Sequence, residues 1–156
     1  MSKPWLTFDC YDTLVRYSEG KAAALATLVR EKGGDDTAVD RAQSAFEACE
    51  KKLQLGPFII FNAVLRKSLH AGLEAAGLPI TASDEETIIK AVKLSEPFPD
   101  TGPALADLKR DFRLAILSNS EPEIIRHNIA SIGIEFDAVV LAAEAKCYKP
   151  DHGMFR

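Results

Sequence analysis

Short apolar runs separated by stretches of helical periodicity dominate the sequence. The runs WLTF, RLAIL and AVVL occupy residues 5–8, 113–117 and 138–141, and each has the length and texture of a buried strand. Elsewhere, apolar side chains recur every three or four residues, which is typical of amphipathic helices. Strands that alternate with helices predict an α/β protein with a parallel sheet covered on both faces.

The stretch between the first two predicted strands has a purely helical pattern. It predicts four helices, which begin near residues 21, 37, 58 and 83 and end near residues 33, 55, 76 and 94. Ser83 is the expected N-cap of the fourth helix. This block is too long for one crossover helix, so we interpret residues 18–96 as a helical cap. The cap interrupts a Rossmann-like core made of residues 1–17 and 97–156.

The second half of the chain returns to an alternation of helices and strands. Helices are expected over residues 104–110 and 121–132, the latter stopped by Gly133. A loop through Lys149 and Pro150 follows the third strand, and a further helix is expected to start at Asp151.

Composition narrows the class of protein. The chain has 156 residues, of which 47% are hydrophobic and 27% charged, enough for one packed core. A net charge of −4 argues against nucleic-acid binding, and no apolar run is long enough to span a membrane. The three widely spaced cysteines favour reduced thiols over disulfides. We therefore expect a cytoplasmic protein that acts on a small molecule, while a homodimer remains open.

Polar side chains follow each predicted strand. Asp9 and Asp12 come after the first strand, Ser118 and Asn119 end the second, and Lys149 lies a few residues beyond the third. Ligands of open α/β sheets bind beyond these carboxyl ends of the strands. Each residue also has an ordinary alternative, because Asp, Ser and Asn cap turns and helices and most Lys side chains are simply solvated. If each residue had only such a structural role, there would be no reason for suitable polar residues to follow all three strands in turn.

These residue types suit a hydrolytic site. Of two nearby carboxylates, one can attack or bind a metal while the other exchanges a proton, roles that Asp9 and Asp12 fit. Thr13 adds a hydroxyl that could hold the loop or touch a substrate. A serine and an asparagine at the second strand tip can donate hydrogen bonds to an anion. Lys149 could neutralise a substrate anion and restrain the carboxylate of Asp9.

A competing motif lies in the same segment. Cys10 and Arg16 have the C-x5-R spacing of the phosphate loop of cysteine phosphatases. That loop needs small residues, whose backbone N–H groups converge on the phosphate, and no acid nearby. Tyr11 is bulky and Asp12 is acidic, so we discount a thiol nucleophile.

Three motifs together resemble a known family. The runs FDCYDTL at residues 8–14, LSNS at 117–120 and YKPD at 148–151 are similar, in that order, to the first three motifs of the haloacid dehalogenase superfamily. The first and third are most similar to those of type II 2-haloacid dehalogenases. This resemblance implies a hydrolase that acts on a small 2-substituted carboxylic acid without a cofactor. Asp9 would attack the substrate carbon, and water would hydrolyse the resulting aspartyl ester.

The resemblance also implies roles for the neighbouring residues. Lys149 would stabilise the charge of Asp9. An arginine early in the cap usually holds the halide in this subgroup, and Arg41 is the nearest candidate by position. The expected substrate-binding residues are Tyr11, Thr13, Ser118, Asn119 and Arg41.

Two departures from the family pattern keep alternatives open. The subgroup normally has glycine at the position of Asp12, whereas aspartate there is the pattern of the superfamily's magnesium-dependent phosphatases. In that alternative Asp9 and Asp12 hold Mg²⁺ and Asp9 attacks phosphorus. The fourth family motif would follow Lys149 by a few tens of residues, so we expect a truncated chain with impaired turnover. A third alternative is an inactive remnant that binds a partner through a free sheet edge.

Overall fold

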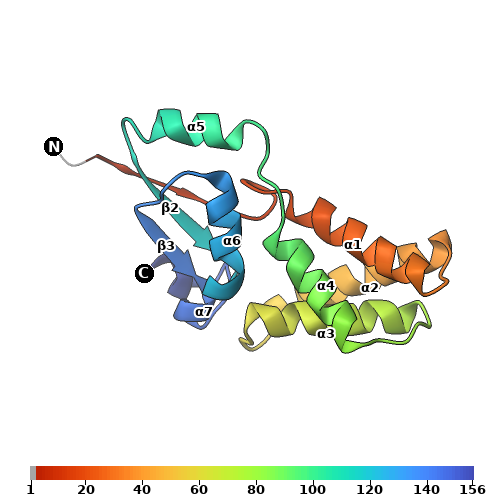
Figure 1. The fold of residues 1–156 in the computed structure, drawn as a ribbon. Coiled ribbons are helices and arrows are strands. Elements are labelled where there is room, and N and C mark those ends of the chain that lie inside the picture. The colour runs from red at the N-terminus through yellow and green to blue at the C-terminus, as the bar shows by residue number, and fades with distance from the viewer. Residues whose placement is uncertain (1–2) are drawn as a thin grey trace.

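A computed structural model describes residues 3–156 as an α/β structure with one parallel sheet (Figure 1). The sheet contains β1 (Trp5–Phe8), β2 (Arg113–Ser118) and β3 (Ala138–Leu141), in that spatial order. Phe8 pairs with Ile116, and Ser118 pairs with Leu141. This register brings the loops after the three strands to one edge of the sheet. The predicted α/β class and parallel sheet are confirmed.

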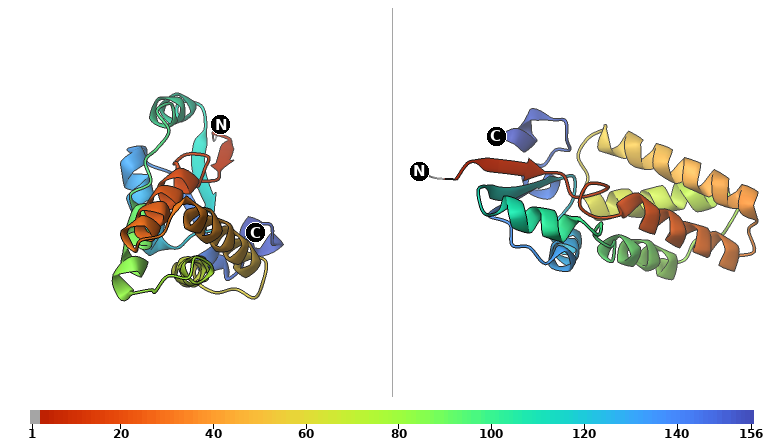
Figure 2. Two further views of the ribbon diagram at one scale, coloured as in Figure 1. Left: turned by 90° about the vertical axis from the view of Figure 1, so that its right-hand side faces the viewer. Right: turned by 90° about the horizontal axis from the view of Figure 1, so that it is seen from above.

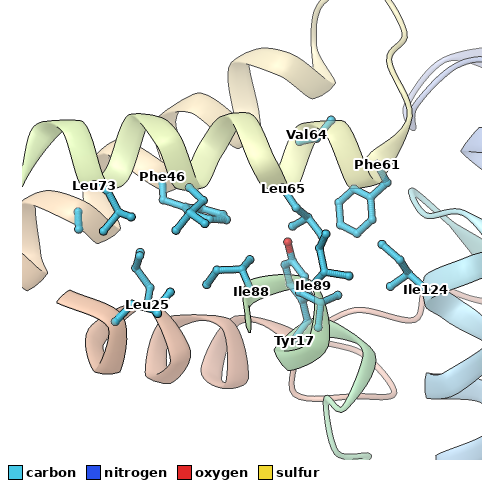
Figure 3. Close-up of a cluster of buried hydrophobic side chains, with 14 of the residues drawn as sticks. Tyr17, Leu25, Phe46, Phe61, Val64, Leu65, Leu73, Ile88, Ile89 and Ile124 are labelled. Atoms are coloured by element: carbon cyan, nitrogen blue, oxygen red, sulfur yellow. The ribbon is translucent and has the colours of Figure 1, made fainter. Parts of the chain in front are cut away.

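Four helices follow β1 and form a bundle beyond the carboxyl ends of the strands (Figures 1 and 2). They are α1 (Tyr17–Glu31), α2 (Asp36–Gln54), α3 (Phe61–Ala75) and α4 (Ala82–Lys93). Leu25, Phe46, Leu65, Leu73 and Ile88 are almost fully buried where the helices meet (Figure 3). Burial of their apolar surface stabilises the bundle. The division into a core and a cap at residues 18–96 stays a prediction.

The remaining helices surround the sheet. Helices α5 (Thr101–Leu108) and α6 (Pro122–Ile132) lie on one face, and the short α7 (Ala142–Ala145) and 3₁₀ helix η1 (His152–Phe155) follow β3 (Figure 2). Gly133 ends α6 with φ of 74°, a left-handed conformation that glycine adopts without strain. Within residues 3–156, no helix is long and apolar enough to cross a membrane.

The strands are less buried than their apolar runs predict. β2 is largely buried, but in β1 exposed and half-buried residues alternate, and the side chain of Trp5 is 49% exposed. The expectation of fully buried strands is wrong for β1 and β3, since each has one neighbouring strand within the described residues.

Two further expectations about local structure need correction. The N-cap of α4 is Thr81 rather than Ser83, because Thr81 and Asp84 form a reciprocal capping box. The four-residue α7 lies where we expected a loop, since so short a helix has no periodic pattern to detect.

Buried polar side chains of α6 and its N-cap fix the helical bundle against the sheet. Glu121, just before α6, is buried and accepts a hydrogen bond from the backbone N–H of Asn62 at the start of α3, at 3.0 Å. Asn128 is fully buried and donates through Nδ2 to the backbone carbonyl of Val92 at the end of α4, at 2.9 Å. Both contacts satisfy backbone groups that helix ends leave unpaired. They help to hold α3 and α4 over the tips of the strands.

Candidate active site

Asp9 follows β1 directly, and its carboxylate is held by one oxygen. Oδ1 accepts a hydrogen bond from the backbone N–H of Cys10 at 2.7 Å and forms an ion pair with Lys149 Nζ at 2.8 Å. In residues 3–156 neither contact involves Oδ2, and the side chain is 45% exposed. The result is an oriented carboxylate with one oxygen open to a small molecule.

Lys149 is fixed from two sides. Its Nζ also donates to the backbone carbonyl of Leu117 near the end of β2, at 2.8 Å. Its backbone N–H donates to Oδ1 of Asn119 at 2.7 Å. The Nδ2 of Asn119 in turn donates to Oε1 of Gln54 at the end of α2, at 3.1 Å. The predicted meeting of Asp9, Asn119 and Lys149 at the strand tips is therefore what the structure has.

A cavity of about 170 Å³ lies between these groups and the helical bundle. It is lined by Asp9, Tyr11, Asp12, Tyr17, Glu50, Gln54, Phe61, Asn119 and Lys149. Asp9, Asn119 and Lys149 form the wall on the sheet side. The opposite wall comes from α1, α2 and α3. A space of this size suits a molecule of few heavy atoms.

Asp12 also lines the cavity, but its carboxylate is engaged with α1. Its two oxygens accept from the backbone N–H of Ser18 at 2.8 Å and from Ser18 Oγ at 2.5 Å. Aspartate at a helix start offsets the partial positive charge of the unpaired N–H groups. Helix α1 starts at Tyr17, earlier than its apolar pattern predicts, and Asp12 contacts its second residue. Asp12 adopts φ of 57°, the left-handed conformation that aspartate tolerates better than most residues.

Asp9 and Asp12, the two metal ligands of the phosphatase alternative, contact Lys149 and Ser18 respectively. In residues 3–156, no group of three or more His, Cys, Asp or Glu side chains is placed to hold a metal ion. Asp12 directs both carboxylate oxygens to Ser18. We therefore derive no step through Mg²⁺, and the phosphatase alternative stays a prediction.

Two expected substrate-binding residues lie away from the cavity. Thr13 is exposed and is not part of the cavity lining. Arg41 is exposed on α2 and lines a separate hollow with Thr37 and Ala75. Position in the sequence suggested Arg41, but its side of α2 does not face Asp9. The structure therefore does not support a halide contact from Arg41.

Tyr11 does line the cavity, with its hydroxyl already engaged. The hydroxyl shares a hydrogen bond of 2.8 Å with Ser120 Oγ, and the ring stacks on that of Tyr17 at 4.6 Å between centroids. Burial raises the pKa of Tyr11 far above its ordinary value. Tyr11 therefore offers the cavity a neutral aromatic face.

Ser118 is fully buried at the end of β2 and lies outside the cavity lining. Its Oγ has no hydrogen-bond partner in the described part of the chain. Its expected role in substrate binding stays a prediction. The neighbouring Ser120 is equally buried, but its Oγ is bonded to Tyr11. The two serines therefore form a matched pair for mutation.

We expect Ser118→Ala to leave the free energy of unfolding unchanged or to raise it by up to about 1 kcal/mol, because a buried unpaired hydroxyl is costly. Ser120→Ala should lower it by about 1–2 kcal/mol, since it breaks a buried hydrogen bond. Urea unfolding of both variants measures the difference. A larger loss of unfolding free energy for Ser118→Ala than for Ser120→Ala would contradict the view that the Ser118 hydroxyl is unpaired.

Cys10 is unsuited to nucleophilic attack. Its side chain is fully buried, and burial together with the nearby negative charge of Asp9 raises its pKa from 9.0 to about 12, against a smaller lowering by Lys149. A reactive cysteine needs the opposite shift. The structure thus agrees with the rejection of the C-x5-R motif, and Arg16 pairs with Glu19 at 3.7 Å instead.

The raised pKa of Cys10 predicts a loss of stability in alkali. Above pH 9 the unfolded chain releases a thiol proton that the folded chain retains up to about pH 12, so the free energy of unfolding falls as pH rises. Cys10→Ala should make this fall shallower by up to about 1.4 kcal/mol per pH unit. Urea unfolding between pH 8 and pH 11 (roughly one unit below the ordinary pKa to two above it) measures the slope. Cys49→Ala is the control, and an equal effect from both variants would refute the prediction.

The sequence pattern did not reveal a charged cluster behind the opposite wall, to which Glu50 and Tyr17 of the lining belong. Lys21 of α1 and Glu50 of α2 form a buried ion pair at 2.5 Å, and the Tyr17 hydroxyl donates to the same carboxylate. Burial and the charge of Glu50 raise the pKa of Tyr17 well above its ordinary value. The sequence feature that could have revealed this cluster is a lysine and a glutamate on otherwise apolar helix faces. Their pairing depends on how α1 and α2 pack.

Together these features define an α/β protein with a lysine-paired aspartate, a candidate nucleophile, beneath a helical bundle. The model of the family described as haloacid dehalogenase-like hydrolase matches residues 5–156. The chain therefore belongs to the haloacid dehalogenase-like hydrolases, and the predicted family is confirmed.

Two relatives have names that describe dehalogenases. "Haloacetate dehalogenase H-2" of Moraxella sp. (strain B) is 26% identical over 148 residues, which cover 93% of this chain and 65% of the relative. "(S)-2-haloacid dehalogenase" of Pseudomonas sp. (strain YL) is 28% identical over 101 residues, or 63% of this chain and 44% of the relative. The L-2-haloacid dehalogenase structure from Xanthobacter autotrophicus superimposes with a TM-score of 0.80 at 24% identity, covering 99% of this chain and 62% of that one. The chain thus spans less than two thirds of each.

Proposed function

We propose that this protein hydrolyses a small 2-halocarboxylic acid through an ester on Asp9. The observation that carries the proposal is the asymmetric hold on the Asp9 carboxylate. Oδ1 is bound by Lys149 and the Cys10 N–H, and Oδ2 is left for attack. The dehalogenase names of the curated relatives support the same reaction class.

In the first step Oδ2 attacks the carbon that bears the halogen. An oxygen–carbon bond forms, and the carbon–halogen bond breaks with its electron pair leaving as halide. The substrate carboxylate would lie near Nδ2 of Asn119, a donor on the sheet side of the cavity. The negative charge of Asp9 is consumed as the ester forms.

In the second step water adds to the carbonyl carbon of the Asp9 ester. Negative charge develops on Oδ1, which Lys149 and the Cys10 N–H contact at 2.8 Å and 2.7 Å. Collapse of the adduct breaks the bond between that carbon and Oδ2. The 2-hydroxy acid departs with Oδ2, the carboxylate is restored, and one proton is released in addition to the halide. Neither step needs a cofactor.

Halide release from 2-chloropropionate tests the proposal. We expect release that is unaffected by EDTA, together with formation of lactate in equal amount. Release of phosphate from small phosphomonoesters, dependent on Mg²⁺ and lost in Asp12→Asn, would instead select the phosphatase alternative. If neither product forms, both hydrolytic proposals fail and the binding-protein alternative gains.

A further inference from the structure

Glu50, which lines the cavity opposite Asp9, belongs to a buried ion pair with Lys21. The side chains of Lys21 and Glu50 are only 7% and 10% exposed, and their charged atoms are 2.5 Å apart. Tyr17 donates its hydroxyl to the same carboxylate, and Lys21 Nζ lies 4.3 Å from the centroid of the Tyr17 ring. The pair joins α1 to α2 beside Tyr17, which belongs to the apolar cluster of the bundle and is labelled in Figure 3.

Stability alone does not account for a buried ion pair. Removal of two charges from water costs about as much as their attraction returns, and apolar side chains of similar volume often stabilise a protein better. The bundle has a second such pair, Lys32 and Asp84 at 2.9 Å, which lines neither the cavity at Asp9 nor the hollow beside it. The pair formed by Lys21 and Glu50 differs because it borders the space in front of Asp9.

That space extends from Asp9 to the ion pair. A hollow of about 370 Å³ between α1 and α2 adjoins the cavity at Asp9, and Lys21 is part of its lining. The two share Tyr17, Glu50, Gln54 and Lys149 as lining residues. A molecule bound at Asp9 can therefore reach Glu50 with the group that lies opposite the sheet.

We propose that Lys21 and Glu50 bind a hydroxyl group on the carbon next to the reacting carbon, so that the substrate is a 2-halo-3-hydroxycarboxylic acid. A hydroxyl can donate to the carboxylate of Glu50 and accept from the ammonium of Lys21 at once. A methyl group at the same place would displace water from both charges without replacing its hydrogen bonds. This inference rests on the proposed function, because the placement of the substrate follows from attack by Asp9.

Binding of the two product-like acids tests the inference without turnover. Lactate and glycerate differ only by the hydroxyl at the third carbon. By titration calorimetry we expect glycerate to bind the protein about tenfold more tightly than lactate, the effect of a hydrogen bond to charged groups. In the double variant Lys21→Met, Glu50→Leu the two acids should bind equally. Lys32→Met, Asp84→Asn changes the other buried pair and should keep the preference for glycerate.

The outcomes separate this inference from the dehalogenase proposal. Equal binding of both acids by the protein, no binding of either, or an undiminished preference in the Lys21→Met, Glu50→Leu variant would overturn the inference. Urea unfolding establishes that this variant is folded. Halide release from 2-chloropropionate and 2-chloro-3-hydroxypropionate is measured alongside. Tighter binding of glycerate with no halide release from either acid would refute the dehalogenase reaction, and with it the halogenated substrate, and would support only the hydroxyl site.

Discussion

Asp9→Asn is expected to abolish halide release, with a fall in kcat of about 10⁴-fold or more, because the nucleophile is lost. The amide keeps the shape of the carboxylate and can still accept from the Cys10 N–H, so the fold should persist. It lacks the negative charge that Oδ2 needs for attack. Chloride release and circular dichroism together separate loss of chemistry from loss of structure. Asp107→Asn, an exposed carboxylate on α5, is the matched control.

Isotope labelling identifies the atom that attacks. In a single turnover in ¹⁸O-water the product should be unlabelled, because it departs with the original Oδ2, while the new oxygen remains on Asp9. Mass spectrometry of the peptide that contains Asp9 detects that label. Label in the first product molecule would mean direct attack by water, with Asp9 acting as a base. Halide release by Asp9→Asn at the original rate would exclude both roles.

The sequence predicted the sheet side of the site because its parts are local. Asp9, Asn119 and Lys149 each follow a short apolar run, and parallel strands bring their carboxyl ends to one edge. Once the runs are recognised as strands of one sheet, proximity of the three side chains follows. The boundaries of β1 and β3 could also be predicted, because each strand coincides with a short apolar run.

The bundle side could not be predicted in the same way. Whether Arg41 or Glu50 lines the cavity at Asp9 depends on the rotation of α2 about its axis, which interhelical packing decides. Asp12 likewise had two reasonable roles. Its carboxylate contacts Ser18, six residues further along the chain, and no periodicity encodes that contact. The partial exposure of β1 could not be predicted either, because it depends on the position of β1 at the side of the sheet, which the apolar run does not encode.

Lys149 has different effects on the two chemical steps. Its ammonium contacts Oδ1 in the free protein, where Asp9 carries a full negative charge. During attack that charge is consumed, so the ion pair stabilises the starting state at least as well as the transition state. During ester hydrolysis charge returns to Oδ1, and the same ammonium then stabilises the transition state. Loss of Lys149 should therefore slow mainly the second step.

Lys149→Met is accordingly expected to lower steady-state turnover by about 10²–10³-fold and to make the Asp9 ester accumulate. Rapid-quench measurement should give a burst of one halide per protein followed by slow release, and intact-mass spectrometry should detect the ester. Lys146→Met, which removes a nearby exposed ammonium, is the control and should show neither effect. A variant that loses the burst together with turnover would show that Lys149 is needed for attack itself. In that case its role in orienting Oδ2 outweighs its stabilisation of the charge on Oδ1.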